Sequence, residues 1–313
     1  MITPTPELVV PALPLPEVSV LGAWLRSPLV TALTPLPILL LVAPAVWWFF
    51  RNTWKELDDE ARVRSAEAPD YQAHVGLILL AVTLTLQEYY GGRNFFLEAV
   101  FPYLVRGEAL GLAFLQTAKF AELYTFGYWV LARIFGYVLL PILTWKVLFP
   151  KVRVLDMGLH TKGFFSHIGL YALCLGVVLL AMVFVGQNAD FAAYYPFYHA
   201  ASRSWFDLLV WESIYFLQFF GLEFYFRGFL LEAFRYRMGS AAIFVMAVPY
   251  CMIHFGKPYL ETHGAIIAGI VLGSLAMKTR SIYAGFLVHI TVAGAMDLMA
   301  LYGKGQLPTR FWP

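Results

Sequence analysis

Five ionisable side chains in apolar stretches of the last third of the sequence have types and spacing suited to chemistry. Glu223 and Arg227 are four residues apart, so on a helix they share one face and lie within reach of an ion pair. His254 and His289 lie in two later apolar runs, and Asp297 follows His289 by about two helical turns. A carboxylate, a guanidinium and two imidazoles provide the acid–base and oxyanion-stabilising groups that amide hydrolysis needs. The spacing therefore predicts a reaction centre shared by three neighbouring helices.

The composition of the whole chain excludes a soluble globule. Of its 313 residues, 60% are hydrophobic and only 13% are charged, which predicts a protein that lies in a lipid bilayer. The net charge is +2 and no long run of Lys or Arg is present, so we expect no nucleic-acid partner. The expected location is a cell membrane, specifically a bacterial inner membrane.

Apolar runs near the ~20 residues that cross a bilayer recur along the chain. They predict an all-α, polytopic membrane bundle of about eight transmembrane helices, at about 29–50, 76–92, 121–149, 164–186, 205–234, 240–256, 262–277 and 281–302. The segment 93–118 is more polar and is predicted to lie at the membrane interface. Three regions result: a proline-rich leader at 1–28, N-terminal transmembrane helices with the interfacial segment at 29–160, and a catalytic transmembrane core at 161–313.

Lys and Arg are concentrated in the connections that follow the first, third, fifth and seventh predicted spans. The positive-inside rule places such connections in the cytoplasm. These residues are Arg51, Lys55, Arg62, Arg64, Lys151, Arg153, Lys162, Arg235, Arg237, Lys278 and Arg280. Both termini are therefore predicted to lie outside the cytoplasm.

Three further ionisable residues, Glu88, Arg133 and Glu212, lie in predicted spans. An ionisable group at the centre of a membrane helix costs roughly 2.5–3.5 kcal/mol on insertion scales, so each needs a partner, an aqueous cavity or a functional role. One interpretation is pairing between helices, with Arg133 neutralised by a neighbouring carboxylate. The other is an ion path, which would favour a proton-coupled transporter or binding protein. The absence of a transporter-type internal repeat favours the first interpretation.

Three short patterns in the apolar helices carry a resemblance to a known family. They read Leu222-Glu223-x-x-x-Arg227, Tyr250-x-x-x-His254 and His289-x-x-x-Ala293. In order and spacing they resemble the signature of the CPBP intramembrane proteases, which include the CAAX prenyl endopeptidases and the Abi-type membrane proteins: Glu-Glu-x-x-x-Arg, Phe-x-x-x-His and His-x-x-x-Asn. The resemblance covers roughly residues 160–302. It implies an intramembrane endopeptidase that hydrolyses a peptide bond in a membrane-anchored or lipidated protein.

Two positions depart from the family pattern. The first glutamate of the family, taken as the base that activates water, corresponds to Leu222, and the asparagine thought to help hold the oxyanion corresponds to Ala293. Either Glu223 has taken over as the base, or the chain keeps the fold as a catalytically inactive membrane scaffold. We favour the first interpretation, because polar residues are costly to retain in a membrane.

The resemblance then implies a role for each of the five ionisable residues. Glu223 and His254 would activate the water, and His289 would stabilise the oxyanion. Arg227 would hold the Glu223 carboxylate, and Asp297 would orient His289.

A metal-dependent protease is the nearest rival within proteolysis. The histidines with Glu223 or Asp297 are candidate zinc ligands, and Glu261 and His263 lie close after His254 in the sequence. No His-Glu-x-x-His pair is present on any helix. We therefore expect no metal ion and no other cofactor.

Overall fold

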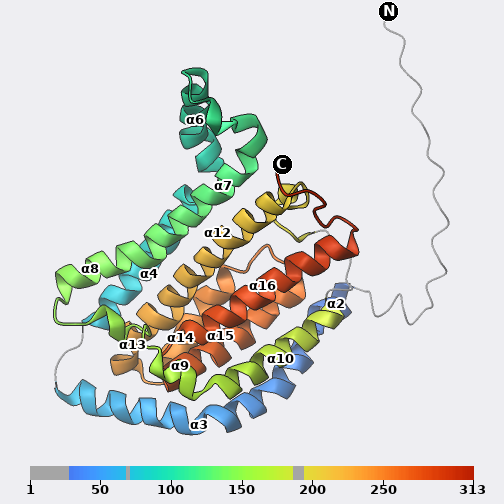
Figure 1. Ribbon diagram of the computed structural model, residues 1–313. Helices are drawn as coiled ribbons and strands as arrows, with labels where there is room; N and C mark the ends of the chain where they lie inside the picture. Colours follow the sequence, from blue (N-terminus) through green and yellow to red (C-terminus); the bar gives the residue numbers. More distant parts are fainter. Residues whose placement is uncertain (1–27, 68–70, 186–193) are drawn as a thin grey trace, which may run out of the picture. The chain divides into compact units, whose positions relative to one another are not determined.

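The computed structural model describes residues 28–67, 71–185 and 194–313. Over these ranges the regular structure is helical, and the only extended pairing is an isolated bridge between Leu159 and Ser281. The chain divides into two compact units, residues 1–48 and 49–313. The prediction of an all-α membrane bundle is confirmed, as Figure 1 shows.

The first unit contains helix α2 (Pro28–Leu33) and the beginning of α3 (Pro35–Glu67), which continues into the second unit. Pro35 opens α3 at a position where a missing backbone N–H costs nothing. The predicted proline-rich leader lies outside the described residues, apart from Pro28, which begins α2.

The second unit contains the end of α3 and the helices that follow it. They are α4 (Gln72–Tyr90), α5 (Arg93–Phe95), α6 (Phe101–Ala109), α7 (Thr117–Ile134), α8 (Leu140–Leu148), α9 (Lys162–Ser166), α10 (Ile168–Val185), α12 (Trp205–Glu223), α13 (Leu231–Met238), α14 (Ala241–Met252), α15 (Tyr259–Thr279) and α16 (Tyr283–Gly303). The π-helical turns Phe135–Leu139 and Phe224–Leu230 join α7 to α8 and α12 to α13 without a break.

Every predicted apolar run overlaps a helix of the structure. Five of the described helical stretches are long and apolar enough to cross a membrane: Pro35–Ser65, Thr117–Leu148, Trp205–Met238, Tyr259–Thr279 and Tyr283–Gly303. Two shorter apolar helices, Ile168–Leu180 and Ala241–Met252, accompany them. The count of eight spans therefore stays a prediction. The more polar segment 93–118 forms α5, α6 and the short turns beside them.

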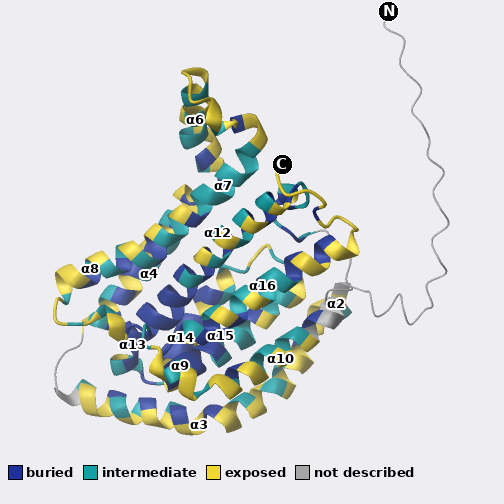
Figure 2. Cartoon of the chain, viewed as in Figure 1, coloured by how far each residue is buried: buried dark blue, intermediate teal, exposed yellow. Residues whose placement is uncertain are grey.

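The stretch formed by α12 and α13 is the centre of the second unit. In its most apolar window 78% of the residues are buried, compared with 22% for the stretch formed by α7 and α8. It contacts α7 and α16 along α12, and α4 and α14 along α13. Figure 2 shows the buried residues gathered on α12, α13, α14 and α15. Polar side chains in this stretch are consequently enclosed by other helices.

The N-cap residue Ser204 fixes the beginning of α12. The hydroxyl of Ser204 accepts a hydrogen bond from the backbone N–H of Asp207 at 3.1 Å, and it donates to Asp207 Oδ2 at 2.6 Å. Arg203 contacts the same carboxylate through Nε at 2.8 Å and through a terminal nitrogen at 2.6 Å, and Tyr198 donates to it at 2.8 Å. These bonds to Asp207 raise the pKa of Arg203 above its ordinary value.

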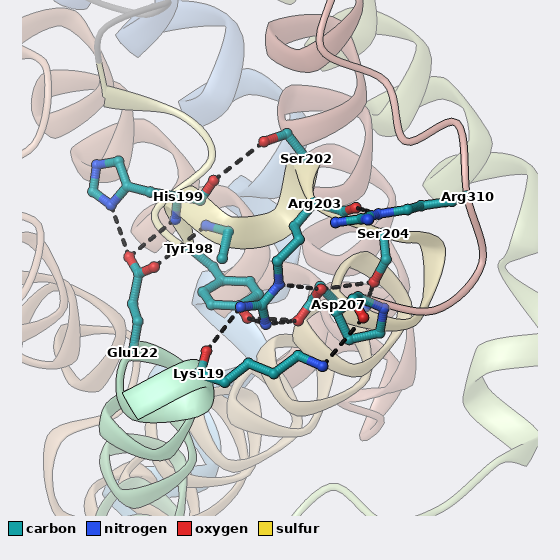
Figure 3. A network of polar contacts seen from close by, with 11 residues as sticks. Lys119, Glu122, Tyr198, His199, Ser202, Arg203, Ser204, Asp207 and Arg310 are labelled. Carbon is teal, nitrogen blue, oxygen red and sulfur yellow. Dashed lines mark hydrogen bonds and ion pairs between the residues drawn. The ribbon is translucent and has the colours of Figure 1, made fainter. Parts of the chain in front are cut away.

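The same network ties α12 to distant parts of the chain (Figure 3). Arg203 donates to the backbone oxygen of Lys119 at 2.8 Å, and Glu122 accepts from the backbone N–H of His199 at 3.0 Å. Arg310 donates to the backbone oxygen of Arg203 at 3.1 Å. The first turn of α12 is thereby fixed against α7 and the C-terminal segment.

The prediction of a carboxylate partner for Arg133 is wrong for the residues that the structure describes. Arg133 donates to the hydroxyl of Tyr137 at 2.6 Å, and its guanidinium lies 5.6 Å from the ring centroid of Trp129. Aromatic faces and a hydroxyl one helical turn away therefore take the place of an ion pair.

Candidate active site

Glu223, Arg227 and His289 lie together at the contact between the central stretch and α16. Arg227 is 3.2 Å from Oε1 of Glu223, and Nδ1 of His289 is 2.9 Å from the same oxygen. The side chains of Glu223 and Arg227 are fully buried, whereas that of His289 is 15% exposed. Arg227 belongs to the π-helical turn, a local widening that recurs at functional sites. The predicted grouping of these three residues is therefore present.

Tyr250 on α14 links the remaining predicted residue to this group. Its hydroxyl lies 3.0 Å from Nε2 of His289, and its ring centroid lies 3.7 Å from the guanidinium carbon of Arg227. Its backbone oxygen is 2.8 Å from Nδ1 of His254. We call Glu223, Arg227, Tyr250 and His289 the Glu223 cluster.

His254 is placed where α14 ends. The last carbonyls of a helix lack partners within the helix, and the His254 side chain supplies one for Tyr250. A carbonyl oxygen only accepts, so Nδ1 of His254 carries the proton and Nε2 of the neutral ring carries a lone pair. Nε2 makes no hydrogen bond to any residue that the structure describes. His254 therefore presents a base nitrogen beside the Glu223 cluster.

Close packing fixes the position of the His289 ring. Phe219 stacks against it with ring centroids 5.1 Å apart and planes inclined by 9°. Gly285, one helical turn before His289, lets α16 approach α12, because a Cβ atom there would overlap the carboxylate of Glu223. The contact between Glu223 and His289 thus depends on a glycine.

Asp297 is not part of the Glu223 cluster. Its Oδ2 accepts a hydrogen bond from Nε1 of Trp211 at 2.7 Å, and its acidic neighbour is Glu212. Within the described ranges no hydrogen bond or ion pair joins Asp297 to His289. The contacts that orient His289 come from Glu223 and Tyr250 instead.

The candidate metal ligands are dispersed. Glu261 accepts hydrogen bonds from Lys257 and from the hydroxyl of Tyr195, each at 2.7 Å, and His263 is bonded to the backbone oxygen of Tyr259 at 2.9 Å. Among the described residues, no group of three or more His, Cys, Asp or Glu side chains is arranged to hold a metal ion.

The two positions that depart from the family pattern are apolar and enclosed. Leu222 is 5% exposed in the cluster around Phe226 and Phe229, and Ala293 is 4% exposed beside Tyr215. Neither position offers a polar atom of its side chain to the site. The polar side-chain atoms at these motifs therefore belong to the Glu223 cluster and His254.

Tyr250 begins the second sequence pattern, but no role was predicted for its side chain. The feature of the sequence that could have identified it is the hydroxyl, because the second family pattern has phenylalanine where this chain has tyrosine. A tyrosine in an apolar helix needs a polar partner for its hydroxyl, and that partner is His289.

One comparison with known proteins identifies the segment that carries the site. Residues 204–295 match the family model described as type II CAAX prenyl endopeptidase Rce1-like. No curated protein and no solved structure matches the chain. The matched segment begins at Ser204, the cap of α12, and includes the Glu223 cluster and His254.

The match and the five candidate spans together identify a membrane-integral protein, and the matched family implies protease activity. Over residues 204–295 the chain is similar to the Rce1-like type II CAAX prenyl endopeptidases, which confirms the resemblance to the CPBP family that its motifs carry.

Proposed function

We propose that this protein is an intramembrane endopeptidase in which His254 is the general base. The observation that carries the proposal is the hydrogen bond between Nδ1 of His254 and the Tyr250 carbonyl, which makes Nε2 the nitrogen with the lone pair in the neutral imidazole. A general base needs a lone pair on a fixed ring, and the bond to Tyr250 holds the His254 ring with Nε2 free of hydrogen bonds to the described residues. The family match over this segment supports the same reaction class.

In this mechanism His254 first accepts a proton and then donates it. Nε2 of His254 takes a proton from water as the water oxygen attacks the scissile carbonyl carbon, which produces a tetrahedral oxyanion. The protonated His254 then gives its proton to the leaving nitrogen as the carbon–nitrogen bond breaks. The products are a carboxylic acid and an amine, so no external reagent is needed beyond water.

Glu223 acts through His289 and does not itself take the proton from water. Its carboxylate is fully buried between Arg227 and His289, whereas His289 has an exposed edge. His289 stabilises the oxyanion, because the carboxylate at Nδ1 supports positive charge on the imidazole as negative charge develops on the substrate. Arg227 keeps the carboxylate in place.

The substrate class follows from the site's position within apolar helices. We propose a protein that is itself anchored in the membrane, by a helix or by a covalent lipid, because such a chain can present its peptide bond at that depth. The mechanism assigns no step to a metal ion.

A second candidate function is supported by Leu222 and Ala293. These apolar side chains occupy the two positions where the family has polar groups. A protein with these residues and no cleavage activity would be a membrane scaffold that binds such substrates without hydrolysing them.

The experiment is cleavage of a panel of lipidated and transmembrane peptides by the purified protein in detergent, with products identified by mass spectrometry. We expect cleavage at one peptide bond, and the same rate after treatment with a metal chelator. Loss of cleavage with chelator, regained on adding zinc, would contradict the metal-free mechanism. No cleavage of any peptide by a folded sample would favour the scaffold.

A further inference from the structure

Tyr250 makes three contacts to the site through three different parts of the residue. The backbone oxygen holds His254, the ring lies against Arg227, and the hydroxyl contacts His289. The residue is 1% exposed, so these contacts are made within the packed interior. The first two would remain if Tyr250 were phenylalanine, since a phenylalanine has the same backbone and a similar ring.

The hydroxyl is therefore the only part of Tyr250 whose role packing does not explain. We propose that this hydroxyl is a positioning group for His289, which holds the imidazole with Nδ1 beside the Glu223 carboxylate. The effect of the hydroxyl on catalysis rests on the proposed function. The orientation of the His289 ring rests on geometry alone.

The hydroxyl of Tyr250 can hold Nε2 of His289 in either charge state of the ring. It donates to the lone pair of a neutral imidazole and accepts from the N–H of a protonated one. The contact therefore persists when the imidazole takes on positive charge, with Nδ1 at 2.9 Å from the Glu223 carboxylate.

The result is a chain of contacts that runs from Arg227 through Glu223 and His289 to Tyr250. The contact at Nε2 fixes the rotation of the His289 ring. Without the hydroxyl, Nε2 would have no partner among the described residues. A histidine that has to stabilise an oxyanion depends on a fixed orientation.

The test is the variant Tyr250→Phe, which removes only the oxygen atom. Its matched control is Tyr225→Phe, at a tyrosine that is also fully buried and whose hydroxyl donates to the backbone oxygen of Leu79 at 3.3 Å, away from the cluster. Thermal unfolding of both variants in detergent checks that each is folded.

The first readout is nitrogen NMR of protein labelled with ¹⁵N at the histidine rings. The His289 signals are assigned by their absence in His289→Asn. We expect the Nε2 resonance of His289 to shift in Tyr250→Phe and to stay unchanged in Tyr225→Phe. An unchanged His289 spectrum in Tyr250→Phe would overturn the inference, whether or not any substrate is cleaved.

The second readout uses a peptide that the wild-type protein cleaves. We expect kcat to fall about tenfold in Tyr250→Phe with KM changed by less than about twofold, since the hydroxyl acts on the reacting state through His289. An unchanged kcat together with a shifted spectrum would overturn the catalytic part of the inference. If the wild-type protein cleaves nothing, the proposed function fails and the NMR result alone decides the positioning role.

Discussion

Nδ1 of His289 lies 2.9 Å from Oε1 of Glu223, a contact that joins α16 to the last residue of α12. Both residues come from family motifs that are far apart in the sequence. The Glu223 carboxylate is fully buried, so it acts on its surroundings through His289, whose side chain is partly exposed.

Replacing Glu223 by glutamine should abolish most of the cleavage activity. The amide keeps the size of the side chain but removes the negative charge that supports a positive His289. We expect kcat/KM to fall about 100-fold or more, a size typical of the loss of an oxyanion-stabilising contribution. The measurement is the initial rate of peptide cleavage in detergent.

This variant also leaves the buried Arg227 without its counter-charge, which costs about 3–5 kcal/mol. The double variant Glu223→Gln with Arg227→Gln removes both charges and should recover part of the thermal stability while it stays inactive. A double variant that regains activity along with stability would show that Glu223 serves the fold alone.

Substituting Gly285 by alanine should separate α16 from α12. The added Cβ would overlap the Glu223 carboxylate, and overpacking of this kind costs about 1–3 kcal/mol. We expect a lower unfolding temperature and a slower cleavage rate. The control is Gly264→Ala on α15, where nothing lies within 4 Å of the added Cβ and alanine favours the helix. Equal effects of the two substitutions would contradict the close approach.

Asp207→Asn should destabilise the protein without a direct effect on the chemistry. Asp207 is fully buried and accepts hydrogen bonds from Arg203, Ser204 and Tyr198. Loss of its charge therefore weakens several hydrogen bonds at the beginning of α12. We expect a loss of about 1–3 kcal/mol in the free energy of unfolding. Asp59→Asn is the control, since Asp59 is 52% exposed and pairs only across one helical turn with Arg62. Similar unfolding temperatures for both variants would argue against the network.

The helical segment that contains α6 should loosen in acid. Glu108 accepts hydrogen bonds from the backbone N–H of Thr117, at 2.8 Å, and from its hydroxyl. These bonds, the side-chain one first, lower the pKa of Glu108 below its usual value. A carboxyl whose pKa is lowered by folding contributes stability above its ordinary pKa and loses it as the pH falls through the lowered value.

Hydrogen exchange of residues 107–117 as a function of pH measures this effect. Protection should decrease at low pH in the wild-type protein and should already be low at neutral pH in Glu108→Gln. A segment whose protection is the same in both proteins at every pH would contradict the assignment.

The sequence predicts those parts of the structure that depend on local spacing. Periodic apolar runs place the helices, and the interval of four residues brings Arg227 to Glu223, because neighbours on one helix face are fixed by the helix itself. The contact between His289 and Glu223 was expected only through the family resemblance.

Contacts between helices depend on how each helix is rotated about its axis, which spacing does not determine. Asp297 was expected beside His289 because the two share a helix, yet it faces Trp211. Arg133 was expected to meet a carboxylate and instead meets Tyr137. The hydroxyl of Tyr250 reaches His289 only because α14 turns that face toward α16.

A pair of histidine variants tests whether His254 is the base. His263 makes the same kind of bond as His254, from Nδ1 to the backbone oxygen four residues earlier, but lies outside the site. The measurement is kcat for His254→Gln and His263→Gln on one cleaved peptide. We expect a loss of about 100-fold or more for His254→Gln and wild-type activity for His263→Gln. Wild-type activity in a folded His254→Gln variant would contradict this assignment.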